Sequence, residues 1–247
     1  MKVFVVAEVG VNWDGNLHLA KQMIQQAHIA GADAVKFQAF LREHVEGHPE
    51  AEKILESSVT MDNVGTFRSI ADANSIEFFC TPFYPDAVDF LYKAGVRRFK
   101  IRERDSREML EDPTLISPIM KRILDVDWRN EIFVSCQTPP LVNKWFWNSN
   151  VHTLYCVPQY PPRLEEIDFS TIRAFHGYSN HYPSIEVPLL AASRLNPAIG
   201  PKIIEVHVTA NHDMKVPDAA VSFDFVELQT LVKYLRTLEY LETEHDV

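Results

Sequence analysis

Cysteine is scarce in this sequence, and its spacing is unlike that of a metal site. The three cysteines, Cys80, Cys136 and Cys156, lie far apart, each in an apolar run of the kind that forms strands. A disulfide framework needs paired cysteines, and a cysteine-rich metal site needs close spacing. We therefore predict reduced thiols in the core of a cytoplasmic protein.

Basic residues are also in short supply. The sequence has 24 Lys and Arg against 34 Asp and Glu, which gives a formal net charge of −10 at pH 7. Nucleic acids and anionic membranes bind basic surfaces, so we expect neither as the main partner. An anionic small molecule could still bind where a few lysines gather.

Long hydrophobic runs are missing as well. The N-terminus has a single lysine and then a short apolar run that Glu8 interrupts, so we expect neither a signal peptide nor a membrane-spanning helix there. No low-complexity segment or linker interrupts the chain, and its 247 residues suit one α/β barrel. We expect a single domain, residues 1–247.

Strand-like apolar runs alternate with helical patterns along the chain. We expect strands at residues 3–9, 33–39, 76–82, 96–101, 131–135, 152–157 and 202–208, with a further apolar run at 172–176 that leads toward His181. Apolar residues at helical spacing predict helices at 17–30, 64–73, 87–94, 114–124, 189–194 and 225–241. A short helix within 40–60, a charge-dense rim loop at 102–113 and a turn at 159–162 complete the pattern. Strand and helix alternating eight times over predict an α/β fold, a (β/α)8 TIM barrel.

Each predicted element of this barrel ends on or near a polar residue. These residues are Glu8, Lys36, Thr81, Lys100, Ser135, Tyr160, His181 and His207. In TIM barrels the carboxyl ends of the strands form the active face. We therefore expect these side chains to share one site.

Lys36 and Lys100 are the candidates for binding an anion. A lysine at a strand end inside a barrel is costly to bury without an opposite charge. Either a bound anion or a nearby carboxylate, Glu8 or Asp105, could supply that charge. Gln38 lies two residues after Lys36 and would face the same side of its strand.

His181 and His207 are the candidates for binding a metal. Glu205 and His207 are two residues apart, so on a strand both side chains point to the same side. If that side is the barrel lumen, they share a site with His181. Two imidazoles with open positions for water and substrate are typical of a catalytic metal site. The alternative is that both are ordinary buried or rim histidines.

At this point the residues resemble a known family, the N-acetylneuraminate (sialic acid) synthases. The motifs that carry the resemblance are Ala7-Glu8-Val9-Gly10-Val11-Asn12, Ala34-Val35-Lys36-Phe37-Gln38, Cys80-Thr81-Pro82-Phe83, Phe99-Lys100-Ile101, Gly177-Tyr178-Ser179-Asn180-His181 and Ile204-Glu205-Val206-His207. They occur in the family's order, at near-family spacing, over almost the whole chain. The resemblance implies condensation of phosphoenolpyruvate with an aldose, typically N-acetylmannosamine, with release of phosphate. It also implies a divalent metal, usually Mn²⁺, with Mg²⁺, Co²⁺ and Zn²⁺ as alternatives.

The resemblance also assigns roles to particular residues. His181 and His207 match the family's metal ligands, and Lys36 and Lys100 match its phosphoenolpyruvate-binding lysines. The expected catalytic residues are Glu8, Lys36, Lys100, Tyr160 and Glu205, and the expected substrate-binding residues are Gln38, Thr81, Arg102, Ser135, Ser179 and Asp218. The metal would polarise the aldehyde or hold a water, the lysines would neutralise phosphoenolpyruvate, and a carboxylate would manage the proton.

The departures from the family pattern bear on the substrate. After Lys100-Ile101 the family usually has a small residue and then a serine that helps to hold the phosphate, whereas here the residues are Arg102 and Glu103. A carboxylate facing a phosphate is repulsive. Either Glu103 turns away and Arg102 takes over, or the pocket holds something else. Further departures are Ser135-Cys136-Gln137 for Ser-Thr-Gly, Pro158 for Asn, Asn180 for Asp and Ala219 for His.

The chain ends about one helix after the predicted barrel. Most members of the family carry a C-terminal antifreeze-like domain that lends an arginine to the partner's sugar site, and we expect a barrel without it. The acceptor is then expected to differ from a standard N-acetylated hexosamine. A homodimer through the helix at 225–241 stays open.

The preferred function is thus metal-dependent condensation of phosphoenolpyruvate with an aldose or another aldehyde, giving a sialic-acid-like 2-keto sugar acid. One alternative is a metal-dependent lyase or transferase on the same barrel that no longer uses phosphoenolpyruvate. The other is a non-catalytic barrel that partners a full-length synthase.

Overall fold

The fold is a closed barrel of parallel strands surrounded by helices. The computed structural model describes residues 2–139 and 143–244. The strands are β1 (Val3–Gly10), β2 (Ala34–Ala39), β3 (Glu77–Pro82), β4 (Arg98–Ile101), β5 (Glu131–Cys136), β6 (Val151–Cys156), β7 (Gly177–Asn180) and β8 (Lys202–His207). They follow one another around the barrel in chain order, and β8 closes it by pairing with β1. The predicted (β/α)8 barrel is confirmed.

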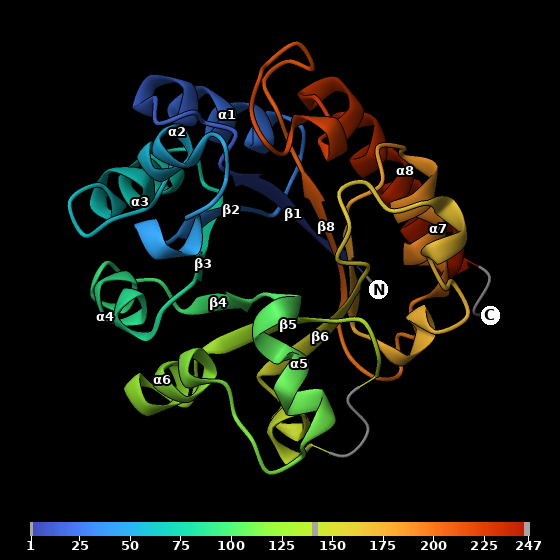
Figure 1. The fold of residues 1–247 in the computed structure, drawn as a ribbon. Coiled ribbons are helices and arrows are strands. Elements are labelled where there is room, and N and C mark those ends of the chain that lie inside the picture. Colours follow the sequence, from blue (N-terminus) through green and yellow to red (C-terminus); the bar gives the residue numbers. More distant parts are fainter. Residues whose placement is uncertain (1, 140–142, 245–247) are drawn as a thin grey trace.

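The helices lie outside the barrel (Figure 1). They are α1 (Leu17–Ile29), α2 (Ala51–Glu56), α3 (Val64–Ala73), α4 (Pro85–Lys93), α5 (Glu103–Glu111), α6 (Pro118–Val126), α7 (Glu186–Arg194) and α8 (Phe225–Glu244). Short 3-10 helices occur at η1 (Arg42–His44), η2 (Lys144–Trp147), η3 (Leu164–Glu166), η4 (Ile172–Ala174) and η5 (Ala219–Val221). Among the described residues, no helix has the length and hydropathy needed to cross a membrane.

The predicted loop at 102–113 is wrong, because most of it is helix α5. Its charges hid the helical pattern: Glu103, Ser106 and Met109 are buried and lie three residues apart, which places them on one helix face. Arg107 bonds Glu103 on the preceding turn, as charges four residues apart on a helix can.

The predicted helix at 114–124 begins only at Pro118. Ser117 accepts a hydrogen bond from the Met120 N–H and so caps the helix, and proline fits the first helical position because its missing N–H has no partner there. The apolar run at 172–176 is likewise not a strand. It contains the 3-10 helix η4, and the strand that follows is β7.

Strands β7 and β8 approach each other closely. A Cβ atom added to Gly177 would lie 2.5 Å from the Ile203 carbonyl oxygen and 2.8 Å from the Ile203 Cβ. Only glycine fits there without moving a strand. This glycine therefore helps to set the distance between the strands that end near His181 and His207.

The lower part of the barrel is packed with aromatic side chains. The rings of Phe79 and Phe133 meet edge to face, with centroids 5.7 Å apart, and Phe4 meets Phe133 in the same way. The Arg98 guanidinium lies 4.3 Å from the Phe4 ring centroid and bonds Glu77 and Glu131. This packing closes the lumen below the polar rim.

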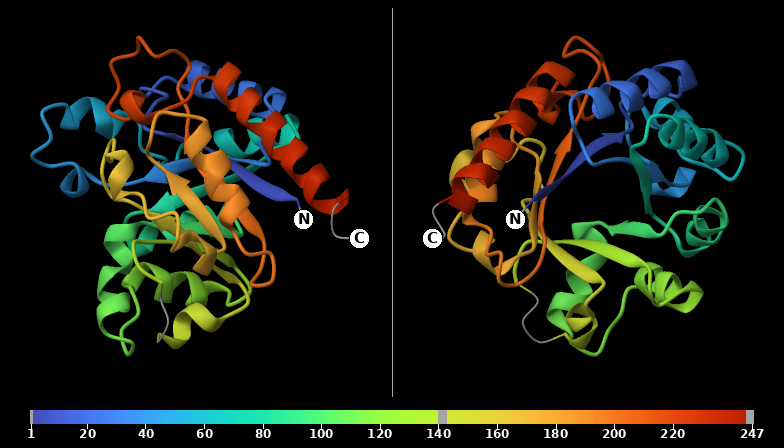
Figure 2. Two further views of the ribbon diagram at one scale, coloured as in Figure 1. Left: turned by 90° about the vertical axis from the view of Figure 1, so that its right-hand side faces the viewer. Right: turned by 180° about the vertical axis from the view of Figure 1, so that it is seen from behind.

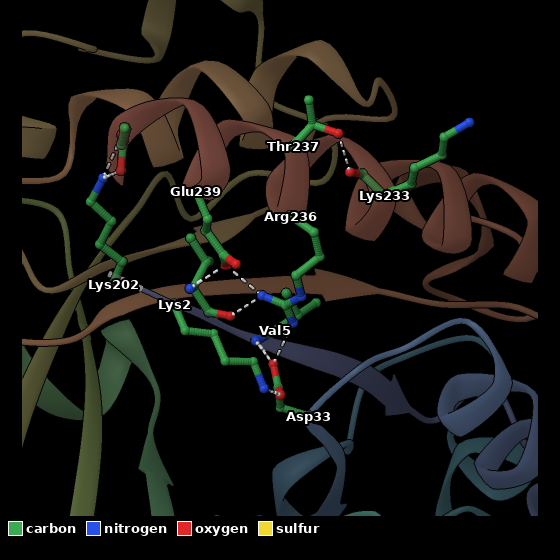
Figure 3. A network of polar contacts seen from close by, with 10 residues as sticks. Lys2, Val5, Asp33, Lys202, Lys233, Arg236, Thr237 and Glu239 are labelled. Atoms are coloured by element: carbon green, nitrogen blue, oxygen red, sulfur yellow. Dashed lines mark hydrogen bonds and ion pairs between the residues drawn. The ribbon is translucent and has the colours of Figure 1, made fainter. Parts of the chain in front are cut away.

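The C-terminal end of helix α8 lies near the N-terminus (Figure 2). Charged side chains tie the helix to the strands at the bottom of the barrel (Figure 3). Arg236 donates to the Val3 carbonyl, at 2.8 Å, and to the carboxylates of Asp33 and Glu239. Asp33 also accepts from the Val5 N–H. The contacts join α8 to the starts of β1 and β2, at the end of the barrel opposite the predicted site.

Candidate active site

The structure brings every residue of the predicted site to one pocket at the carboxyl ends of the strands. The pocket has a volume of about 550 Å³. Its lining includes Glu8, Lys36, Gln38, Thr81, Lys100, Arg102, Ser135, Tyr160, Ser179, His181, Glu205, His207 and Asp218. The role of each residue stays a prediction, but their common location is established.

Buried acidic and basic side chains alternate across the floor of this pocket. The Lys36 Nζ lies 2.5 Å from Glu8 Oε2 and 3.8 Å from Glu205 Oε2, and it donates to Thr81 Oγ1. The Lys100 Nζ lies 2.5 Å from Glu205 Oε1. The predicted alternative partner Glu8 is thus found for Lys36. Asp105 is not the partner of Lys100; it bonds Arg102 instead.

Two polar side chains hold the carboxylates in place. Gln38 donates to Glu8 Oε1 at 2.7 Å, and Ser179 donates to Glu205 Oε1 at 2.7 Å. Gln38 lies two residues after Lys36 on β2, so both side chains reach the lumen, as the pattern predicts. Each carboxylate is therefore oriented from a neighbouring strand.

The two carboxylates differ in their affinity for protons. Burial raises the pKa of Glu8, although Lys36 opposes the shift. Glu205 is also buried, but Lys100 and Lys36 lower its pKa to about 2. Burial lowers the pKa of Lys100, and Glu205 opposes that shift. Glu205 thus stays ionised, whereas Glu8 takes a proton more easily.

The two histidines lie next to each other beyond β7 and at the end of β8. Their ring centroids are 5.4 Å apart. Nδ1 of His181 lies 2.8 Å from the Val157 carbonyl oxygen, and because a carbonyl only accepts, Nδ1 carries the proton and Nε2 has a free lone pair. Nδ1 of His207 is buried without a hydrogen-bond partner among the described residues and lies 3.5 Å from Asp218 Oδ2.

Burial keeps both imidazoles neutral. It lowers the pKa of His181 to about 4 and that of His207 well below its usual value. Burial, with the Glu8 charge, raises the pKa of Asp218 to about 7. Neutral imidazole is the form that binds metals. An unprotonated Nε2 on one ring, an unpartnered nitrogen on the other and a nearby carboxylate are a donor set that could hold a divalent metal.

Tyr160 covers this pair of histidines. Its ring stacks on the His181 ring at a centroid distance of 4.0 Å and meets His207 edge to face at 5.7 Å. It lies in the predicted turn at 159–162, where the Tyr160–Pro161 peptide bond is cis. Tyr160 is 55% exposed, so its other face is open to solvent at the rim of the pocket.

Arg102 and Glu103, the departure from the family pattern, are each paired with a neighbour. Arg102 bonds both oxygens of Asp105, at 2.6 and 2.9 Å, and lies over the Phe83 ring. Glu103 is buried and accepts from Arg107 at 2.7–3.0 Å. The Glu103 charge is therefore compensated within α5.

Several lining residues were not predicted from the sequence. They are Val11, His48, Ile54, Phe83, Arg104, Arg107, Cys156 and Pro217, whereas Glu103 and Pro158, which also line the pocket, are the departures already noted at family site positions. Arg104 and Arg107 were missed together with helix α5, because its buried face includes Glu103 and Ser106, which give no apolar pattern. The apolar wall of Val11, Ile54 and Phe83 comes from three separate segments, so no local pattern joins it.

A second group of donors lies away from this pocket. Donor atoms of His212, Asp224 and Glu227 lie within 4.8 Å of one another. Asp224 and Glu227 bond each other's backbone N–H at the start of α8, and His212 bonds Glu227 at 2.8 Å. Helix capping accounts for this group.

Comparisons with known proteins agree with this geometry. A family model described as the NeuB family matches residues 23–246. The N,N'-diacetyllegionaminic acid synthase of Legionella pneumophila is 28% identical over 270 residues, which cover 97% of this chain and 73% of the relative. The human N-acetylneuraminate-9-phosphate synthase is 27% identical over 267 residues, which cover 96% of this chain and 70% of the relative. The crystal structure of an N-acetylneuraminic acid synthetase from Leptospira borgpetersenii, in complex with citrate, has a TM-score of 0.83 and 27% identity and covers 98% of this chain and 85% of that one.

Proposed function

This chain belongs to the NeuB family, and from that membership and its pocket we propose that it condenses phosphoenolpyruvate with an aldose. In the balanced reaction, C3 of phosphoenolpyruvate bonds to the aldehyde carbon, one water is consumed, and phosphate is released to leave a keto group at C2. The product is a sialic-acid-like 2-keto sugar acid. The relatives' names describe synthases of such acids.

The observation that carries the proposal is the pair of buried lysines on the pocket floor. Lys36 and Lys100 are 4% and 3% exposed and both reach Glu205. Fixed ammonium groups in a site shielded from water stabilise the charges of phosphate and carboxylate strongly. Glu8 and Glu205 hold the two ammonium groups in position on the floor.

The two carboxylates suit different tasks. Glu205 stays ionised and positions the lysines. Glu8, whose pKa burial raises, is the candidate to carry the proton that the aldehyde oxygen needs once the carbon–carbon bond forms. Two nearby acids whose pKa values are pushed apart commonly divide general acid–base work in this way.

His181 and His207 are the residues that would hold a divalent metal, with Asp218 beside them. Mn²⁺ is the expected ion, with Mg²⁺, Co²⁺ and Zn²⁺ as alternatives. When bound, such an ion supplies Lewis acidity toward the aldehyde oxygen. Tyr160 stacks on the His181 ring and holds it in place.

The two alternative functions rest on weaker grounds. A lyase or transferase without phosphoenolpyruvate rests on Arg102 and Glu103 in place of the small residue and serine, but Arg102 is paired with Asp105 and Glu103 with Arg107. A non-catalytic barrel has no need for two buried lysines and two buried histidines around one pocket, since each is costly to bury. Both observations support the condensation.

Phosphate release tests the proposal. Purified protein with Mn²⁺, phosphoenolpyruvate and a panel of aldoses is compared with His181→Ala and with Arg129→Gln, an exposed arginine that bonds Asp127 just before β5. We expect release that requires an aldose, is lost in His181→Ala and is retained in Arg129→Gln. No release with any aldose from folded, metal-loaded protein would favour the alternatives.

A further inference from the structure

Asp218 reaches the pocket from a connection and not from a strand. It lies in residues 208–224, between β8 and α8, directly before the short 3-10 helix η5. Side chains on such connections are held less precisely than those on strands. Yet Asp218 Oδ2 lies 3.5 Å from His207 Nδ1, and a Cβ atom added to Gly10 would lie only 3.2 Å from the same oxygen. The position of this carboxylate therefore depends on what fastens the connection to the barrel.

Asn12, in the loop after β1, fastens both ends of this connection. Its side chain is fully buried. The Nδ2 group donates to the Val208 carbonyl oxygen at 2.8 Å and to Ser222 Oγ at 2.9 Å. Because a carbonyl oxygen only accepts, the atom that faces Val208 is the amide nitrogen, and this fixes the orientation of the side chain. One amide group thus joins the first strand to the start and to the end of residues 208–222.

Ser222 passes this constraint to Asp218. Its hydroxyl accepts from Asn12 and donates to the Asp218 carbonyl oxygen at 2.6 Å. Ser222 is 1% exposed, so water does not compete for these bonds. Lys53 on α2 also bonds this connection, at the Lys215 carbonyl, but that contact is exposed. The buried link from β1 to Asp218 therefore runs through Asn12 and Ser222.

Packing alone does not explain an asparagine at position 12. Among residues 2–139 and 143–244, its Oδ1 atom is buried without a hydrogen-bond partner. A buried acceptor that lacks a donor is destabilising. Leucine has a similar shape and would avoid this cost, but it could not donate to Val208 or Ser222. The two donations are what the asparagine supplies.

We infer that Asn12 is a positioning residue that acts through Ser222 to hold Asp218 beside His207, and that it thereby strengthens the binding of a divalent cation by the two histidines. The inference rests on the proposed function, because it concerns the metal site of that reaction. A carboxylate next to a metal-binding histidine fixes the ring, and its loss commonly weakens metal binding by about tenfold to a hundredfold. Holding the backbone of that carboxylate should account for part of this factor.

Mn²⁺ titrations of folded protein without substrates test the inference, with free Mn²⁺ measured by electron paramagnetic resonance. Ser222→Ala removes the link and Asn12→Leu removes the donor. Thr209→Val is the matched control, because it removes a buried hydroxyl from the same connection that bonds Asn211 and not Asp218. We expect each of the first two variants to bind Mn²⁺ about three- to tenfold more weakly than wild type. Thr209→Val should bind like wild type.

A double variant shows whether the two residues act along one path. Asn12→Leu combined with Ser222→Ala should lose no more affinity than the weaker-binding single variant, because both changes break the same link. Asn12→Ala replaces Asn12→Leu if the leucine variant does not fold. Wild-type affinity in both single variants, additive losses in the double variant, or an equal loss in Thr209→Val would each overturn the inference.

Phosphate release separates this inference from the proposed function. If both hold, Ser222→Ala should need about three- to tenfold more Mn²⁺ for half-maximal release, with kcat at saturating Mn²⁺ close to wild type. The expected pattern of Mn²⁺ binding without phosphate release from any aldose would support the positioning role and reject the condensation. Release with the wild-type Mn²⁺ dependence in both single variants, or a wild-type protein that binds no Mn²⁺, would reject the positioning role.

Discussion

Lys100 and Glu205 face each other across the barrel lumen, and each compensates the buried charge of the other. Both are nearly inaccessible to water, and Lys100 is the closer of the two lysines to Glu205, at 2.5 Å against 3.8 Å. Removing one partner from a buried pair leaves the other charge without compensation, which costs more than the pair itself contributes. At the scale of single residues, the site is a set of mutually dependent charges.

We expect Lys100→Met to lower the free energy of unfolding by about 3 kcal/mol, at the low end of values for broken buried pairs because Lys36 remains nearby. Urea unfolding measures the change. Lys121→Met is the control: it breaks an exposed pair with Asp125, and surface pairs contribute up to about 1 kcal/mol. Equal losses of unfolding free energy in the two variants would show that Glu205 does not need Lys100 to compensate its charge.

His176 makes stability depend on pH. Burial, together with the nearby His152, lowers its pKa from 6.5 to about 4, and its Nδ1 accepts from the Thr153 N–H. Between pH 6.5 and 4 the unfolded chain binds more protons at this histidine than the folded chain does. Its contribution to stability is therefore complete above pH 6.5 and is lost as the pH falls toward 4.

We expect the free energy of unfolding to fall between pH 7 and 5 and the slope to be smaller in His176→Asn, whose side-chain oxygen can still accept from Thr153. Urea unfolding at several pH values measures the slope. Exposed His18→Asn should keep the wild-type slope. An unchanged slope in His176→Asn would show that other groups cause the pH dependence.

At the scale of elements, the close approach of β7 and β8 positions the metal candidates. Gly177 has no room for a Cβ against Ile203, and the two strands deliver His181 and His207. A change in strand spacing at Gly177 should therefore alter both the stability of the barrel and the distance between the imidazoles.

We expect Gly177→Ala to lower the free energy of unfolding by about 1–3 kcal/mol, as overpacking does, and also to reduce phosphate release. Gly65→Ala is the matched control, because a Cβ there meets nothing within 4 Å on helix α3. It should raise stability by up to about 1 kcal/mol. A well-folded Gly177→Ala protein with wild-type activity would contradict the positioning role.

Some elements of the fold and the site could be predicted from the sequence, and others could not. The strands were predictable because buried parallel strands are continuous apolar runs. Their polar ends were predictable because a charged or polar residue is conspicuous at the end of such a run, as at Glu8, Lys36, Lys100 and His207. Helix α5 was not predictable, because its buried face includes Glu103 and Ser106, which are polar and give no hydrophobic pattern. The partner of Lys100 was also missed, since Glu205 lies 105 positions away and only closure of the barrel brings the two together.

At the scale of the whole molecule, the active-site pocket and the contacts that fasten the last helix lie at opposite ends of the barrel. The pocket lies at the carboxyl ends of the strands, whereas the contacts of Arg236 with Val3, Asp33 and Glu239 lie at the opposite end (Figure 3). These contacts fasten the last helix to the first two strands. A defect there should weaken the fold as a whole without touching the pocket.

We expect Arg236→Met to lower the free energy of unfolding by about 1–2 kcal/mol, because three hydrogen bonds are lost at a partly exposed site. Lys233→Met, an exposed position on the same helix without a carboxylate partner in the described chain, should change it little. In both variants, kcat/KM measured well below the unfolding temperature should match wild type, because the pocket keeps every residue that lines it. A fall in kcat/KM for Arg236→Met alone would mean that closure at the bottom of the barrel is coupled to the geometry of its rim.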